Sequence, residues 1–148
     1  MTDFHLVDVF ATERYAGNQL AVVESGGAAL EMADSDPDDI DVAELHDMFT
    51  ILEFLQMEGL GFAEQGRAWE QVMDGRTQRD GELPINTSGG LKSKGHPLGA
   101  SGVAQVVELY EQLTGGAGER QVEAETGLAC NVGGFGNCVT TTVLEVDG

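Results

Sequence analysis

The sequence predicts an α/β domain preceded by a short β-hairpin. β-rich segments lie on both sides of one long segment with helical spacing, and glycine-rich turns separate these segments. The 148 residues and the hydrophobic content of 41% suffice for one core. These observations favour a globular chain over a repeat array or a disordered acidic tail.

The first part of the chain has the pattern of the hairpin. Residues 4–10 and 19–24 are rich in aliphatic and β-branched residues, and the turn-forming residues 15–18 connect them. The two glycines after Ser25 break this pattern. We therefore predict a domain boundary here, with the hairpin in residues 1–25 and a second unit in residues 26–148.

The first half of the second unit mixes both kinds of element. Residues 28–32 have helical character, and residues 40–45 predict a short strand. Residues 48–56 have apolar positions at helical spacing, and two glycines end this helix. Residues 67–81 are polar and predict a surface excursion with one helical turn near Trp69.

The second half predicts one long helix and a terminal hairpin. Residues 127–132 and 139–146 are β-rich, and the glycines of 133–136 supply the positive φ that a tight turn needs. Before them, one apolar stripe with helical period consists of Val103, Val106, Val107, Tyr110 and Leu113.

The charge of the chain is strongly negative. Aspartate and glutamate number 26 against 7 lysines and arginines, which gives a formal net charge of −19. Such a surface repels phosphate backbones, so nucleic-acid binding is disfavoured. The acid excess predicts a protein from a salt-saturated cytoplasm, as in halophilic archaea, and an acidic protein from any cytosol is the alternative.

Membrane and metal sites are also disfavoured. No apolar run approaches the ~20 residues of a membrane span, and the first residues lack the pattern of a secretory signal. Cys130 and Cys138 form neither a disulfide framework nor a zinc-ligand pattern. We expect a cytoplasmic protein with both thiols reduced, no metal and no membrane partner.

Two histidine motifs have functional interpretations. His96 stands in a glycine-rich segment, and Pro97 after it suits the first turn of a helix, whose positive end disfavours imidazolium. A neutral base is one interpretation, and a helix-capping loop is the other. His46 follows a predicted strand, where ligands often bind, but the motif alone favours a polar junction in which Asp47 caps the next helix.

A third motif is the glycine turn of the terminal hairpin. Gly133 and Gly134 follow a strand that contains Cys130 and Asn131. Consecutive glycines can direct amides toward one point and stabilise an anion. The alternative is an ordinary hairpin turn.

Together the motifs resemble the thiolase family. The sequences HDMF at 46–49, NTSGGLKSKGHPLGASG at 86–102 and GLACNVGGFG at 127–136 follow in the thiolase order and at similar separations. The resemblance covers about residues 28–146 and the C-terminal half of a thiolase, nearest the archaeal and sterol-carrier-protein-type branch. It implies half of a thiolase-like α/β fold, with a mixed sheet and helices on its faces.

The resemblance also implies an activity and roles for individual residues. Thiolases are acyltransferases of lipid metabolism that move acetyl and longer acyl groups between coenzyme A thioesters, which are substrates, so no other cofactor is expected. His96 matches the histidine that activates the nucleophilic cysteine and lines the first oxyanion hole. His46 matches the residue that positions a water there. Gly133 and Gly134 match the turn that serves the second oxyanion hole.

The sequence departs from the family pattern at the sulfur-bearing positions. No segment matches the nucleophilic cysteine, which the family carries in its N-terminal half. Met48 replaces the acid/base cysteine of this branch, and a thioether has no proton to transfer. Asn131 stands where other thiolases have that cysteine, and Cys130 beside it would point to the other face of a strand.

Residues 4–24 resemble a different family, the PhzF-like isomerases. The segment FHLVDVFATERYAGNQLAVVE is similar to the start of that family, but Gln19 replaces its usual proline and its catalytic glutamate has no match. We interpret this segment as a grafted hairpin fragment, and PhzF-like isomerase activity is a minor alternative.

These features lead to two functional hypotheses. The chain is either a thiolase C-terminal domain that needs an N-terminal half for its nucleophile, or a non-catalytic remnant that binds a partner. The expected partners are an acyl-CoA, an N-terminal thiolase half or a second copy of the chain, and an OB-fold/zinc-ribbon protein.

The charge makes a testable prediction about stability. Carboxylate repulsion is poorly screened at low ionic strength, so the unfolding temperature should rise as KCl increases from ~0.15 M to multimolar concentration. Thermal unfolding followed by circular dichroism across this range tests it. A flat response would contradict the halophilic interpretation.

Overall fold

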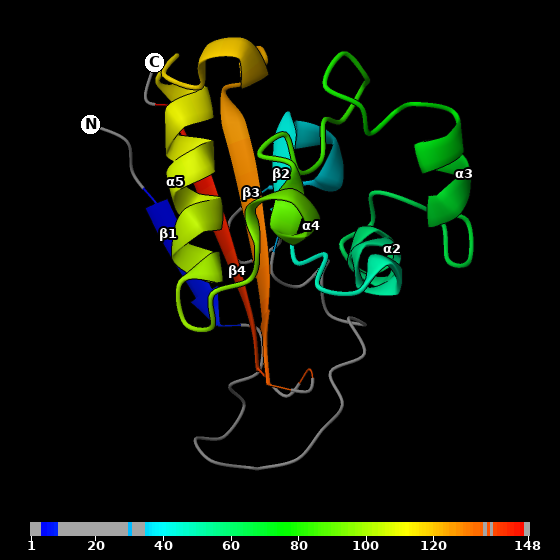
Figure 1. The fold of residues 1–148 in the computed structure, drawn as a ribbon. Coiled ribbons are helices and arrows are strands. Elements are labelled where there is room, and N and C mark those ends of the chain that lie inside the picture. The colour runs from blue at the N-terminus through cyan, green and yellow to red at the C-terminus, as the bar shows by residue number, and fades with distance from the viewer. Residues whose placement is uncertain (1–3, 9–29, 31–34, 135, 137, 147–148) are drawn as a thin grey trace.

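The computed structural model describes residues 4–8, 30, 35–134, 136 and 138–146, which form a mixed sheet with helices on its faces (Figure 1). The sheet order is β1-β4-β3-β2. β2 and β3 are parallel, whereas β4 pairs antiparallel with both β3 and β1. The strands are β1 (Phe4–Asp8), β2 (Val42–Leu45), β3 (Thr126–Gly133) and β4 (Cys138–Glu145). This arrangement confirms the predicted α/β class.

The helices divide between the two faces of the sheet. α5 runs along one face, where Leu109 packs on residues of β2, β3 and β4 (Figure 1). α2 and α3 contribute to the larger core on the other face. The α-helices are α2 (Thr50–Gly59), α3 (Ala68–Met73), α4 (Gly90–Lys94) and α5 (Ser101–Leu113), and the short 3₁₀ helices are η1 (Pro37–Asp39) and η2 (Gly118–Arg120). None of the described helices is long and apolar enough to cross a bilayer.

Alternation along the strands separates the two cores. On β3, Leu128 and Cys130 point into the larger core together with Met57 and Leu60. Ala129 points to the opposite face and packs under Leu109 of α5. The face that carries α5 therefore also receives the side chains of Glu44, His46 and Asn131, which share its parity.

Most predicted elements are confirmed in the described residues. β3 and β4 form the terminal hairpin, β2 lies within the predicted strand over 40–45, and α3 is the helical turn near Trp69. Residues 4–8 form a strand as predicted, and this strand pairs with β4. The second hairpin strand at 19–24 and the boundary after Ser25 lie outside the described residues, so the predicted division into two units remains a prediction.

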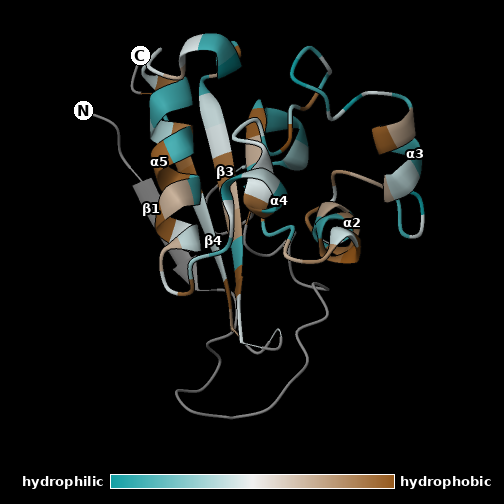
Figure 2. Cartoon of the chain, viewed as in Figure 1, coloured by the Kyte–Doolittle hydropathy of each residue, from teal (hydrophilic) through white to brown (hydrophobic). Residues whose placement is uncertain are grey.

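The long helix buries a different side from the one its apolar stripe predicts. Val103, Val107 and Tyr110 are 64%, 49% and 58% exposed. Only Val106 and Leu113 of the stripe pack against the smaller core. Hydrophilic and hydrophobic residues consequently both appear along α5 in Figure 2.

Polar residues occupy the buried side of α5 because neighbouring segments supply hydrogen-bond partners. Glu108 accepts hydrogen bonds from Thr87 (3.3 Å) and Arg120 (3.1 Å). Gln112 donates to the carbonyl oxygen of Arg120 (2.9 Å), and its own oxygen accepts from the N–H of Val122 (2.9 Å). Paired in this way, polar groups can be buried without a large desolvation penalty.

Candidate functional site

The backbone at the end of β2 is held by a carboxamide from α2. The buried side chain of Gln56 accepts from the N–H of His46 (3.0 Å) and donates to the carbonyl oxygen of the same residue (2.9 Å). The same nitrogen also donates to the carbonyl oxygen of Leu52 (2.8 Å). Gln56 therefore fixes the backbone of His46 from both sides.

Two further carboxamides complete this end of β2. Asn86 accepts from the N–H of Leu45 (2.8 Å) through its side-chain oxygen. Gln105 of α5 donates to the carbonyl oxygens of Glu44 and Cys130 (both 3.1 Å), one on each of the parallel strands. Side chains from three segments thus add hydrogen bonds to backbone groups at this end of the sheet.

Asp47 anchors α4, which the sequence did not predict. Its carboxylate accepts from the N–H of Leu91 at 2.7 Å. A Cβ at Gly90 would lie 2.3 Å from this carboxylate, so only glycine fits there. Phe49 occupies the N-cap of α2, and no side chain caps that helix. The alternative in which Asp47 caps the helix after His46 is therefore wrong.

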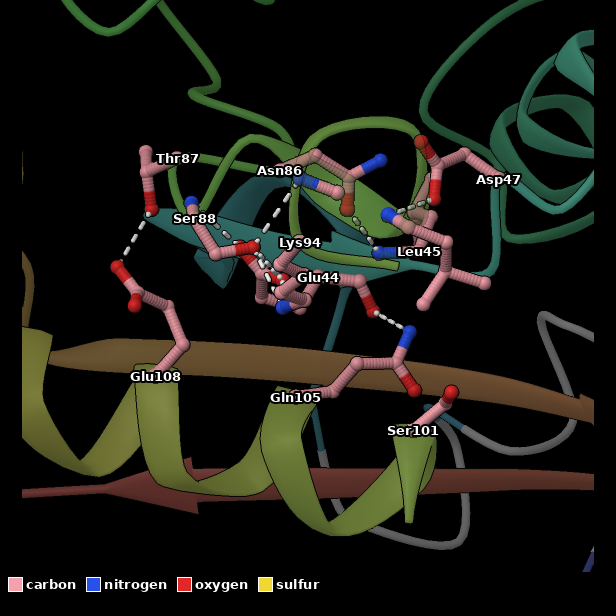
Figure 3. A network of polar contacts seen from close by, with 12 residues as sticks. Glu44, Leu45, Asp47, Asn86, Thr87, Ser88, Lys94, Ser101, Gln105 and Glu108 are labelled. Carbon is pink, nitrogen blue, oxygen red and sulfur yellow. Dashed lines mark hydrogen bonds and ion pairs between the residues drawn. The ribbon is translucent and has the colours of Figure 1, made fainter. Parts of the chain in front are cut away.

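A buried carboxylate lies beside these groups (Figure 3). Glu44 accepts from the hydroxyl of Ser88 (2.6 Å) and the ammonium of Lys94 (3.2 Å). Burial raises the pKa of Glu44, and the hydrogen bonds and charge of Ser88 and Lys94 oppose this shift. This network ties β2 to the segment that leads to His96.

His96 lies in the loop between α4 and α5. Its Nδ1 is 2.7 Å from the hydroxyl of Ser101, the first residue of α5. Pro97 lies in a turn closed by a hydrogen bond from the N–H of Ala100 to its carbonyl oxygen (3.0 Å), so it precedes the helix instead of occupying its first turn. The predicted placement of Pro97 in the first turn of the helix is therefore wrong. His96 nevertheless contacts the start of the helix, because its Nδ1 is bound to the hydroxyl of Ser101.

The two histidines meet edge to face. Their ring centroids are 4.9 Å apart and the ring planes are inclined by 87°. Nδ1 of His46 lies 2.9 Å from the side-chain oxygen of Asn131, so Nδ1 carries the proton of the neutral ring. Burial lowers the pKa of His46, which favours this neutral form. Nε2 of His46 is buried without a hydrogen-bond partner.

The glycine turn ends β3 beside the histidines. Gly134 and Gly136 have φ values of 61° and 88°, the left-handed region that glycine adopts readily. The N–H of Gly136 donates to the carbonyl oxygen of Gly133 (3.2 Å). The predicted turn is confirmed, and the anion-binding role of its amides remains a prediction.

One cavity of about 690 Å³ brings the predicted site residues together. It lies between the start of α5 and the α5 face of β3 and β4. His46, His96, Gly133 and Gly134 all line it. Its other polar lining includes Ser101, Gln105 and Asn131, and its apolar lining includes Met48, Leu98, Val103 and Val106. Among the described residues, no cluster of histidine, cysteine and carboxylate side chains could hold a metal.

The cysteines lie outside this lining. Cys130 is fully buried in the core on the opposite face of the sheet, where burial raises the pKa of its thiol to about 12. Cys138 is exposed on β4 and pairs with Gly133, so it lies on the same face as Asn131. The orientation predicted for Cys130 is confirmed, whereas sequence reasoning did not find the position of Cys138.

Sequence reasoning also missed the residues that support the histidines. Gln56, Ser101 and Gln105 were not predicted as site residues. A signal for two of them is present, because Ser101, Gln105, Glu108 and Gln112 form a polar stripe with helical spacing. A polar stripe on a helix ordinarily faces solvent, so the sequence alone does not indicate that these residues are buried at the site.

Comparison with known proteins assigns the family. A model of the thiolase C-terminal domain-like family matches residues 9–146. The chain belongs to this family. The match begins within the segment predicted as a separate hairpin. The chain is 50% identical over 126 residues to an acetyl-CoA acetyltransferase of Methanothermobacter thermautotrophicus. The alignment covers 84% of the chain and 33% of that protein.

Other relatives are also longer proteins that the chain matches over only part of their length. Human sterol carrier protein 2 is 46% identical over 124 residues, which cover 83% of the chain and 22% of that protein. The solved structure named Ltp2-ChsH2(DUF35) aldolase has a TM-score of 0.73 and 26% identity, and covers 90% of the chain and 35% of that structure's chain. The chain therefore spans about a third or less of the length of these relatives.

The close approach of Gly90 to Asp47 predicts a large effect of one methyl group. Gly90→Ala should destabilise the domain by about 2 kcal/mol or more, because the new Cβ displaces the carboxylate that anchors α4. Gly66 also has a positive φ, but no atom lies within 4 Å of its virtual Cβ. Gly66→Ala is the matched control and should cost about 1 kcal/mol or less in thermal unfolding.

The cysteine environments predict selective alkylation. At pH 8, iodoacetamide should label Cys138 alone in the native protein, since Cys130 is buried and its raised pKa keeps it protonated. Intact mass should show one adduct natively and two in denaturant. Native labelling that persists in Cys138→Ser would show that Cys130 is accessible.

Proposed function

We propose that the chain is the C-terminal half of a thiolase-type acyltransferase that acts on coenzyme A thioesters by thiolysis or Claisen condensation. One observation carries this proposal: two imidazoles in edge-to-face contact and the glycine turn line the same cavity. Family membership and the similarity to an acetyl-CoA acetyltransferase support it.

In this proposal His96 is the base for the attacking thiol. Ser101 holds Nδ1, so Nε2 is the ring nitrogen left for the reacting group. A base held at the start of a helix can take the thiol proton and return it to the leaving thiolate. The hydroxyl of Ser101 donates to the carbonyl oxygen of Pro97 (3.3 Å), so it is placed to accept from Nδ1–H, which leaves Nε2 as the nitrogen that takes the proton.

His46 and the glycine turn serve the developing oxyanions in the same proposal. With Nδ1 bound to Asn131, the unpartnered Nε2 of His46 can accept from a water whose second hydrogen is donated to the thioester oxygen. An amide of Gly133 or Gly134 stabilises the second oxyanion. Such preorganised donors are usually a large contribution to catalysis.

The nucleophile must come from outside the described cavity lining. Cys130 is on the wrong face and Met48, which lines the cavity, has no transferable proton. We propose that an N-terminal thiolase half supplies the cysteine and covers the exposed face of α5 formed by Val103, Val107 and Tyr110. An OB-fold/zinc-ribbon protein is a further proposed partner.

A non-catalytic binding module is the second candidate function. Met48 favours it, because this branch of the family uses a cysteine there for proton transfer. Such a domain would bind an acyl thioester or a thiolase partner without turnover.

The enzymatic proposal predicts no activity from the chain alone. In high-salt buffer, it should show neither measurable acetoacetyl-CoA thiolysis nor an acyl-enzyme by intact mass, since loss of a nucleophile removes several orders of magnitude in rate. Addition of a separately expressed N-terminal thiolase half should restore thiolysis. His96→Ala should then abolish the restored activity.

Two results would contradict this proposal. Turnover by the chain alone that is lost in Cys130→Ala would make Cys130 the nucleophile. A complex with the N-terminal half that binds thioesters but never turns over would favour the binding module. Val107→Glu places a charge on the exposed α5 face and should prevent the complex without changing the fold of the chain alone.

A further inference from the structure

Asn131 has an unused hydrogen-bond donor at the candidate site. Its side-chain oxygen lies 2.9 Å from Nδ1 of His46. The proton of the neutral imidazole is on Nδ1, because on Nε2 it would be a buried donor without a partner. The carboxamide of Asn131 therefore turns its oxygen toward His46, and its Nδ2 keeps two N–H groups to donate elsewhere.

A ligand in the cavity can reach Nδ2 of Asn131. This nitrogen makes no hydrogen bond with any of the described residues, and it is not among the buried polar atoms that lack a partner there, so it retains accessible surface. Asn131 is half-buried and lines the 690 Å³ cavity. A Cβ at Gly102 would lie 3.1 Å from Nδ2, so the missing side chain of this cavity-lining glycine leaves space beside the donor.

The chemistry of this donor defines the ligand group that it can bind. An N–H donor pairs with a carbonyl oxygen, which accepts hydrogen bonds and has no hydrogen of its own. Saturated and 3-oxoacyl thioesters both carry a thioester carbonyl, so the donor suits substrates and products of the proposed reaction alike. The apolar lining from Val103 and Val106 can contact the alkyl part of a short acyl chain.

We propose that Asn131 is a substrate-binding residue that donates a hydrogen bond from Nδ2 to the carbonyl oxygen of an acyl thioester. This inference rests on the proposed function, because it places an acyl thioester in the same cavity. It extends that function by adding a direct donor from β3 to the water-mediated contact of His46. One carboxamide then orients the imidazole through its oxygen and the ligand through its nitrogen. No covalent bond changes in this binding step.

The test compares two neutral ligands that differ only in one carbonyl group. S-butyryl-N-acetylcysteamine is the thioester, and S-butyl-N-acetylcysteamine is the thioether without the carbonyl. Their dissociation constants are measured by NMR titration of the chain in high-salt buffer. We expect the thioester to bind about fivefold more tightly, the effect of roughly one net hydrogen bond. The thioester, and not the thioether, should also shift the side-chain amide signals of Asn131.

Asn131→Asp removes the donor, while it keeps the shape of the side chain and an oxygen for Nδ1 of His46. It should abolish the preference for the thioester. Leu98→Asp is the matched control, because Leu98 is an exposed residue that lines the same cavity, so this variant adds the same charge without removing a donor. It should retain the preference. If Asn131→Asp fails to fold, the amide shifts of the unmodified chain decide the question.

The outcomes separate this inference from the proposed function. Equal binding of thioester and thioether, or a preference that survives in Asn131→Asp, overturns the role of Asn131 while thioester binding still supports the proposed function. A preference that is lost in Leu98→Asp as well assigns the effect to the added charge and also overturns that role. Absence of any thioester binding to the chain, and to its complex with an N-terminal half, overturns both.

Discussion

The end of β2 depends on hydrogen bonds from carboxamide side chains. A strand at the edge of a sheet leaves backbone groups unpaired, and here Gln56, Asn86 and Gln105 bind several of them. Each comes from a different segment of the chain. The position of His46 therefore depends on the packing of α2, of α5 and of the loop before α4. A site built in this way is specified by the whole domain instead of by its own motif.

The sequence motifs predicted which residues lie together in the cavity, but they did not predict α4 or the start of α5. Spacing and glycine content placed the β3–β4 hairpin, and the histidine motifs identified two residues that meet in space. The presence of α4 depends on the contact of Asp47 with Leu91, which is far away in the sequence. Local periodicity contains no record of such contacts.

The burial of α5 shows the same limit of sequence reasoning. Helical period identifies a stripe, but which stripe faces the sheet depends on the partners available. Glu108 and Gln112 are buried because Arg120, Thr87 and Val122 satisfy them. The apolar residues opposite then remain exposed, and this exposure is the observation on which the proposed docking face of α5 rests.

The close packing of α5 on β3 limits how this site can diversify. A Cβ at Gly102 would lie 3.1 Å from Cγ of Asn131, and one at Gly127 would lie 3.1 Å from Leu109. A larger residue at Gly102 would require a shift of Asn131, which contacts His46, and one at Gly127 would require a shift of Leu109. Changes in side-chain size are accommodated more easily at lining residues on the exposed side of the cavity, such as Leu98 and Val103, which are 87% and 64% exposed.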